Sequence, residues 1–392
     1  MVKLILLGLL AGAFFSSTFI LNELMSNAGG HWFWSASLRY VFMWLIISAV
    51  IILQHGFGRI EALASIFLQH WRFWCLTGSI GFGVFYTGIC YAGDHVAGWV
   101  VAATFMFTVV TSLFVLLAFG QRFDKKFIIY AFLVFIGVVL VNVSEGLRAS
   151  ALADIDSTPM AEMLLYGALP ALIAAFSYPI GNQLVWQVSH NSRKHHPHKD
   201  GAKTQQVTED KKLNIEQIHH EHSNQALVSE AFDLSAVMSS TSNNNATLKT
   251  LSSIEVKSSS PPQNLLARIP IIETSLLQNA FNKVWLMTLG SFPFWLVLGA
   301  FIQPEPPATT QLFNTLLVAL LAGVAATSIF FYAREQAVTS SEVAGVDSTQ
   351  ASEVIFALIG GILLLDNAIP SAMGLVGIGL IILGLILFAK DG

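Results

Sequence analysis

The sequence predicts an all-α integral membrane protein. Its ten transmembrane helices would form two inverted five-helix repeats, with a disordered cytoplasmic loop. Of its 392 residues, 54% are hydrophobic and 11% are charged, and the mean hydropathy is +0.64. These values lie outside the range of ordinary soluble domains. Two further observations support the prediction: apolar stretches of spanning length recur along the chain, and similar residues recur in the same order in its two halves.

Ten stretches approach the roughly 20 apolar residues that a helix needs to cross a bilayer. They are 4–26, 32–54, 71–93, 97–119, 127–144, 163–187, 280–302, 312–333, 342–365 and 371–389. The first stretch imitates a secretory signal, because Lys3 precedes an apolar run that reaches the small residues Ala11-Gly12-Ala13. The run continues to about Met25, so we expect a retained first helix.

Basic residues indicate the orientation of these helices. Ten spans put both termini on one side, and lysine and arginine are retained on the cytoplasmic side. With both termini in the cytoplasm, Arg148 is the only clear base at an exterior helix end. We therefore expect cytoplasmic termini.

The composition changes abruptly between helices six and seven. Residues 189–277 are rich in Ser, Asn, Gln, Lys and His and contain few aromatic residues. Such a segment cannot bury enough apolar surface to fold alone, so we expect a disordered cytoplasmic insertion. The first repeat then comprises residues 1–147, and the second comprises 160–188 and 278–390.

The insertion also carries clustered histidines. Neutral imidazoles at short spacing can bind transition metals, but no cysteine joins them, so a metal site is the weaker interpretation. These residues are His195, His196, His198, His219, His220 and His222.

The two halves share an order of residues that suggests duplication. The aligned segments are 17–24 with 177–184, 34–45 with 285–296, 91–92 with 332–333, and 104–113 with 349–358. Five helices in each half would give the two copies opposite orientations in the membrane. A site between two such halves can open alternately to each side.

Two segments resemble a known family. They are FILNELMSNAGGHWFWSASLRY from Phe19 to Tyr40 and DSTQASEVIF from Asp347 to Phe356. Together with the ten-helix pattern, they resemble the drug/metabolite transporter superfamily in its EamA-like form, and more specifically its putative multidrug resistance efflux transporter family. The resemblance implies secondary active transport, cytoplasmic termini and an inner-membrane location. It does not imply a particular substrate.

The ninth expected helix carries three polar residues, Asp347, Gln350 and Glu353, at intervals of three. This spacing places them along one helical surface. A carboxylate in the bilayer centre costs about 2.5–3.5 kcal/mol on insertion scales, so such residues usually face a polar cavity or a partner. They could simply hold helices together. Our preferred hypothesis is that Glu353 exchanges protons and recognises a cation, because burial disfavours its charged form, while Asp347 and Gln350 support it.

Arg39 is a second charge within the membrane, and Glu23 lies near the same exterior end. We expect an ion pair between them, which would act as an orientation clamp rather than as a site. Tyr40, Trp44 and Tyr178 could present aromatic faces to an organic cation. The remaining candidate site residues are Asn22 and Asn182.

The leading hypothesis is proton-coupled export of small organic molecules or cationic drugs by alternating access. The expected partners are the small-molecule substrate, protons and the lipid bilayer, and a homodimer is left open. One alternative is a metal-ion transporter or metal sensor that uses the histidine-rich loop, and another is a metabolite exporter of the amino acid or sugar type. No paired nucleophile and base indicates an enzyme, and no motif indicates a cofactor. The charges form no basic face for nucleic acid.

Overall fold

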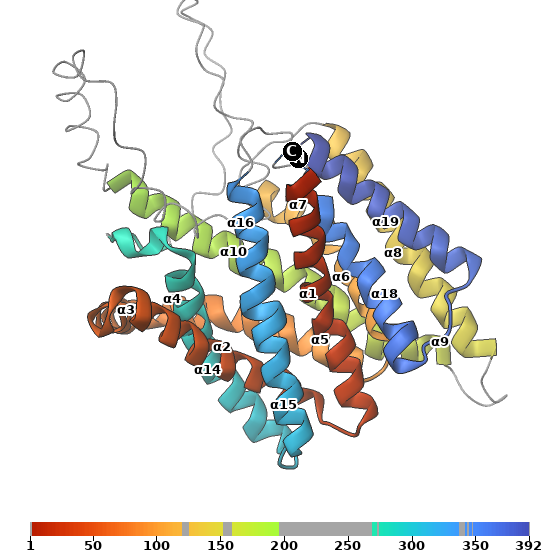
Figure 1. Cartoon of the computed structure of the whole chain (residues 1–392), viewed down its shortest axis with the longest axis horizontal. Coiled ribbons are helices and arrows are strands. Elements are labelled where there is room, and N and C mark those ends of the chain that lie inside the picture. The colour runs from red at the N-terminus through yellow and green to blue at the C-terminus, as the bar shows by residue number, and fades with distance from the viewer. Residues whose placement is uncertain are drawn as a thin grey trace, which may run out of the picture.

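The computed structural model describes residues 2–119, 125–151, 159–195, 269–272, 274–336, 342, 345–346 and 348–391. These residues form helices and connecting turns, and they include no strand (Figure 1). Nine of the described helical segments are long and apolar enough to cross a membrane, and the apolar segment Thr349–Leu365 is shorter. The chain is therefore a multi-pass membrane protein.

The first half begins with a long helix α1 and ends with a long helix α8. Its elements are α1 (Val2–Asn27), α2 (Trp32–His55), α3 (Phe57–Gln69), α4 (Trp71–Gly78), η1 (Ser79–Val84), α5 (Phe85–Gly93), α6 (Gly98–Phe105), α7 (Thr108–Ala118) and α8 (Lys125–Ala151). The helix α3 is absent from the predicted spans. It follows Gly56, whose φ of 78° allows the chain to turn sharply after α2.

The second half begins with a short helix α9 and ends with a long helix α19. Its elements are α9 (Pro159–Glu162), η2 (Met163–Ala168), α10 (Leu169–His195), η4 (Ser275–Gln278), α14 (Ala280–Ile302), α15 (Thr309–Val318), η5 (Ala319–Ala326), α16 (Thr327–Glu335), η6 (Thr349–Ala351), α18 (Ser352–Leu365) and α19 (Ala372–Asp391). The expected span 342–365 thus corresponds to the shorter helical segment Thr349–Leu365 and a few described residues before it.

Two pairs of irregular helical turns occur at corresponding places in the two halves, whereas the π-helical η2 aligns with a regular part of α1. The segments η1 and η5 are both π-helical and lie in the middle of a span. The register that aligns Tyr91 with Tyr332 places η1 on residues 320–325, which lie inside η5. The register that aligns Thr104 with Thr349 places the turn between α6 and α7 where η6 meets α18.

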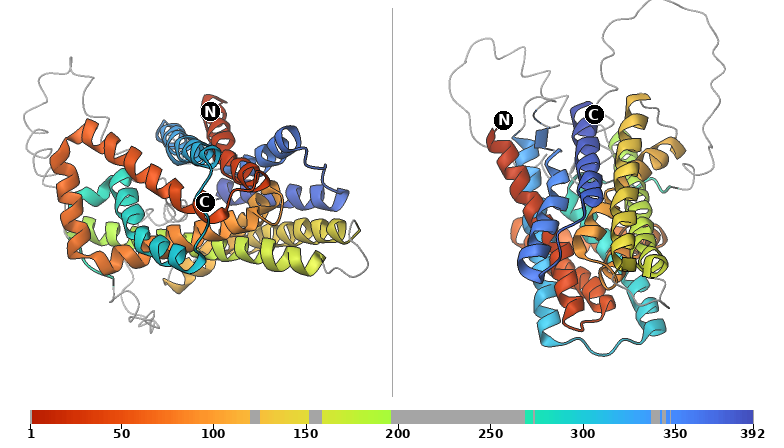
Figure 2. Two further views of the ribbon diagram at one scale, coloured as in Figure 1. Left: turned by 90° about the horizontal axis from the view of Figure 1, so that it is seen from below. Right: turned by 90° about the vertical axis from the view of Figure 1, so that its right-hand side faces the viewer.

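Helices of one half pack against helices of the other. The helix α1 packs against α18 and against the η5–α16 segment, while α2 and α4 pack against α14. The helix α8 lies along α19, and both ends of the chain lie at the same end of the molecule (Figure 2). The helices α1 and α18 run parallel, because Gly8 adjoins Thr349 whereas Ile20 adjoins Gly360.

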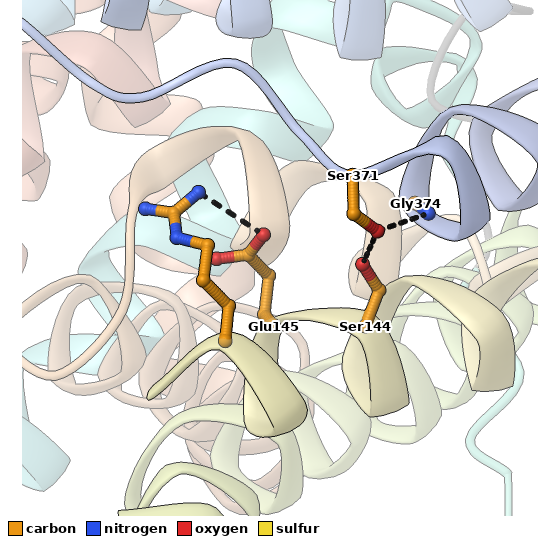
Figure 3. Close-up of polar contacts among 5 residues, drawn as sticks. Ser144, Glu145, Ser371 and Gly374 are labelled. Atoms are coloured by element: carbon orange, nitrogen blue, oxygen red, sulfur yellow. Dashed lines mark hydrogen bonds and ion pairs between the residues drawn. The ribbon is translucent and has the colours of Figure 1, made fainter. Parts of the chain in front are cut away.

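A small polar cluster joins the far end of α8 to the start of α19 (Figure 3). The hydroxyl oxygens of Ser144 and Ser371 are 2.6 Å apart, and the backbone N–H of Gly374 donates to the hydroxyl of Ser371 over 3.3 Å. Arg148 lies beside Glu145, with 3.4 Å between Nη1 and Oε1. The arginine expected at the exterior end is therefore already paired.

The folded part extends further into the predicted insertion than its expected boundaries. The helix α10 continues to His195, and the hydroxyl of Ser189 donates to the carbonyl of Leu277 over 2.9 Å. Ile269 and Ile272 are buried within the same cluster as residues of α14. Residues 196–268, which hold the rest of the insertion, lie outside the described residues.

Candidate functional site

Glu353 lies in the first turn of α18, directly after the 3₁₀ turn η6. The depth of Glu353 can be judged from the neighbouring residues of α1. Ser352 adjoins Gly12, so Glu353 is level with the middle of the 26-residue α1. The carboxylate therefore lies at mid-depth although it is near the start of its own helix.

The Glu353 carboxylate has no hydrogen bond or ion pair with the residues that the structure describes. Ala357, one turn further along α18, is buried in the core, and Gly360 adjoins Ile20 of α1. Glu353 therefore points towards the region between the core and α1. It lies deep in the molecule, yet part of its surface stays accessible.

Other predicted residues in this region are only partly described. Gln350 belongs to η6 and is half-buried, whereas Asp347 lies outside the described residues. His195 is the last residue of α10. The other predicted loop histidines lie outside the described residues; they are His196, His198, His219, His220 and His222. Among the described residues, no group of His, Cys, Asp and Glu is arranged to hold a metal ion.

Glu23 does not form the expected ion pair with Arg39. Its Oε2 accepts a hydrogen bond from the backbone N–H of Gly98 over 2.7 Å, and its Oε1 accepts one from Nδ2 of Asn367 over 2.8 Å. Gly98 is the first residue of α6, where helix N–H groups lack partners within the helix. Asn367 follows Asp366, which ends α18 with a φ of 54°. The carboxylate thus joins two helix ends and leaves Arg39 without it.

Within the part of the chain that the structure describes, the hydrogen-bond and ring contacts of Arg39 are with neutral groups. Its guanidinium lies over the ring of Tyr86, 4.1 Å from the centroid, and Nη1 donates to the hydroxyls of Tyr86 and Thr18. Its Nε is buried and has no acceptor. No carboxylate of the described residues lies within ion-pair distance. Like Glu353, Arg39 lies deep in the molecule but keeps some accessible surface.

The predicted aromatic residues pack against other rings. The Tyr40 ring stacks with Phe82 and with Trp295, at centroid distances of 5.0 and 5.8 Å, and only 3% of Tyr40 is exposed. Its faces are therefore largely occupied by other rings. The Trp44 ring lies 5.9 Å from that of Trp285. The Tyr178 ring lies 5.0 Å from Phe85, and contacts of Tyr86 with both Phe85 and Tyr40 connect it to the Tyr40 ring.

Two buried amides have unused hydrogen-bonding capacity. Apart from the nearby thiol of Cys90, neither amide atom of Asn22 has a partner among the described residues. Gln183 is buried and both of its amide atoms lack a partner within the same part of the chain, and its neighbour Asn182 is also buried. Gln183 was not among the predicted site residues, although the alignment of 17–24 with 177–184 pairs it with Glu23. An unpaired buried polar group costs about 1–3 kcal/mol, so these amides are suited to binding water or a ligand.

A comparison with protein families identifies the kind of molecule. The family described as EmrE, putative multidrug resistance efflux transporter, matches residues 2–391. The chain is 26% identical over 401 residues to the uncharacterized protein YjlA of Bacillus subtilis (strain 168), covering 98% of this chain and 94% of that protein. It is 25% identical over 346 residues to an uncharacterized 42.1 kDa protein of Shouchella clausii, covering 85% of this chain and 65% of that protein. A crystal structure titled only as that of a protein aligns over 99% of this chain and 96% of its own, with a TM-score of 0.48 and 12% identity.

Proposed function

Because the chain belongs to the EmrE family of putative multidrug resistance efflux transporters, we propose that it exports small organic molecules by proton-coupled alternating access. The family supplies the general class, which is small-molecule export across a membrane. Proton coupling and alternating access are our own additions, and each is supported by a different feature of the chain.

Glu353 is the observation on which the proposed proton coupling depends. A carboxylate at mid-depth without a partner costs free energy while it is charged and less when it is protonated. A group that both takes up and releases a proton requires two protonation states of similar free energy, and we assign this property to Glu353.

The corresponding irregular turns support alternating access between two inverted repeats. Mid-helix π-helical and 3₁₀ turns often mark functional hinges. Here η1 and η5 correspond in register, and so do the α6–α7 turn and the η6–α18 junction. Paired irregularities at equal depth would let the two halves exchange conformations around a central site. Both termini lie at the same end of the molecule, which supports an even number of spans. The distribution of basic residues favours the cytoplasmic side of the inner membrane for that end.

Proton movement in proteoliposomes tests the proposal. A pH-sensitive dye inside the vesicles would report proton movement when ethidium, tetraphenylphosphonium or 3-phenylpropionate is added. We expect at least one probe to move protons through the wild-type protein and not through Glu353→Gln. The matched control is Glu61→Gln, which removes an exposed carboxylate of α3. Full proton movement in Glu353→Gln would contradict the assigned role of Glu353.

A further inference from the structure

The positive charge of Arg39 is uncompensated. Arg39 is seven residues from the start of α2, or about 10 Å along the helix, which is within the depth of the bilayer. A buried charge that lacks its counter-charge is strongly unfavourable, whereas a paired charge is tolerated. Since Glu23 is bonded to Gly98 and Asn367, it does not serve as the partner of Arg39.

The groups around Arg39 come from three helices, and none is an anion at neutral pH. Thr18 of α1 and the Tyr86 hydroxyl of α5 accept its hydrogen bonds. Tyr40 and Cys90 are the other titratable groups that act on it, and both are ordinarily neutral. Both accepted hydrogen bonds come from Nη1, so the edge formed by Nε and Nη2 has no partner among the described residues. That edge presents two parallel N–H groups, which match the two oxygens of a carboxylate.

Aromatic rings adjoin Arg39 through Tyr86. The Tyr86 ring lies under the guanidinium and 5.6 Å from the ring of Tyr40, which in turn lies 5.8 Å from Trp295. Among the described residues, the indole N–H of Trp295 is buried without an acceptor, and an indole can only donate. The unpaired edge of Arg39 therefore belongs to a side chain that packs against an aromatic cluster.

We propose that the transported molecule carries a carboxylate, which binds the free Nε–Nη2 edge of Arg39, and an apolar body that lies beside the aromatic cluster around Tyr40. This inference rests on the proposed transport function, because the ligand is the transported molecule itself. It assigns an anionic group to a substrate for which the acidic residue Glu353 alone suggests a cation. Glu353 then serves the proton, and Arg39 serves the substrate.

Four compounds with the same carbon skeleton test the assignment. They are 3-phenylpropionate with a carboxylate, 3-phenylpropylamine with an ammonium, 3-phenylpropanamide with no charge, and phenylalanine with both charges. Binding to the purified full-length protein would be measured by isothermal titration calorimetry and by ligand-induced thermal stabilisation. We expect the two carboxylates to bind more tightly than the amide and the amine.

Two substitutions assign that preference to Arg39. Arg39→Gln should weaken carboxylate binding about 30-fold or more, as loss of one partner of a buried charge pair does in other interfaces. Arg39→Lys keeps the charge but loses the paired donors, so it should lie between wild type and Arg39→Gln. The matched control Arg148→Gln removes a guanidinium that already has Glu145 as partner, and it should leave binding unchanged.

The outcomes separate this inference from the proposed function. No preference for the carboxylates in the wild-type protein, or an unchanged preference in the Arg39 variants, would overturn it, and the wild-type comparison holds even if Arg39→Gln does not fold. Carboxylate binding that depends on Arg39 but moves no protons would support the inference and contradict proton coupling. Proton movement driven only by the cationic probes would support proton coupling and contradict the inference that the substrate carries a carboxylate.

Discussion

Replacing Glu23 with glutamine tests whether this carboxylate joins two helix ends. The carboxylate accepts hydrogen bonds over 2.7 Å from Gly98 and 2.8 Å from Asn367. Glutamine keeps one oxygen but presents an NH₂ group to one of the two donors. One hydrogen bond to a charged group, about 1.5–3 kcal/mol, is then lost, and the other becomes a weaker neutral bond. We expect Glu23→Gln to lower the free energy of unfolding by about 2–4 kcal/mol.

Double-mutant cycles identify the partner of Glu23. Unfolding would be followed by circular dichroism during titration of detergent micelles with SDS, for each single variant and for the doubles. Glu23→Gln should couple to Asn367→Ala by about 1–2 kcal/mol, because the two side chains share a hydrogen bond. Its coupling to Arg39→Gln should stay within about 0.5 kcal/mol, since the two residues share no partner.

Glu61→Gln is the control for loss of a carboxylate, because Glu61 is exposed on α3 and should change stability little. Two results would refute this reasoning. The first is a Glu23→Gln protein as stable as the wild type. The second is stronger coupling of Glu23 to Arg39 than to Asn367, which would restore the ion pair expected from the sequence.

Three further predictions concern packing, pH and the loop. Gly137→Val should destabilise the α8–α19 pair by about 1–3 kcal/mol, because a Cβ at Gly137 would lie 2.6 Å from the carbonyl oxygen of Gly377. The control Gly379→Ala places its Cβ in open space and should change stability little. Thermal unfolding of the two variants measures the difference. Burial raises the pKa of Asp94. The folded state therefore binds that proton more tightly, so stability should rise as pH falls below neutral, and less so in Asp94→Asn. Deleting residues 196–268 should leave the proteoliposome transport of the full-length chain unchanged, whereas loss of transport would favour the metal-dependent alternative.

Most of the fold follows from apolar length alone. Nine expected spans correspond to full-length apolar helices of the described chain, because a helix must hide its backbone in lipid over about 20 residues. The helix α3 was missed because its 13 residues are too short for that search. The described part of the ninth span, Thr349–Leu365, begins with the 3₁₀ turn η6 directly before Glu353. The sequence predicted a polar stripe on this helix but not the irregular turn.

The candidate site was less predictable, because its contacts join residues far apart in the chain. The sequence identified Glu23 and Arg39 as charges at a similar depth, and it offered each as the partner of the other. The actual partners of Glu23 are a backbone N–H, which every non-proline residue carries, and Asn367, which is 344 positions away. No local pattern marks either one. Because the sequence suggested Glu23 as the partner of Arg39, it did not predict the unpaired Nε–Nη2 edge. That edge is seen only in the three-dimensional structure.

The separation of Glu353 from Arg39 has a mechanistic consequence. If the two had paired with each other, the bilayer would hold a neutral pair and the site would gain little by binding an ion. Each instead lacks a partner among the described residues, so binding an ion of opposite charge would lower the cost of each. Under the proposed function, a proton neutralises Glu353 and a carboxylate neutralises Arg39. An exporter driven by an inward proton gradient must carry its substrate out and its proton in. The two charges would therefore be neutralised in opposite steps of the cycle, Arg39 by the carboxylate during the outward step and Glu353 by the proton during the inward step.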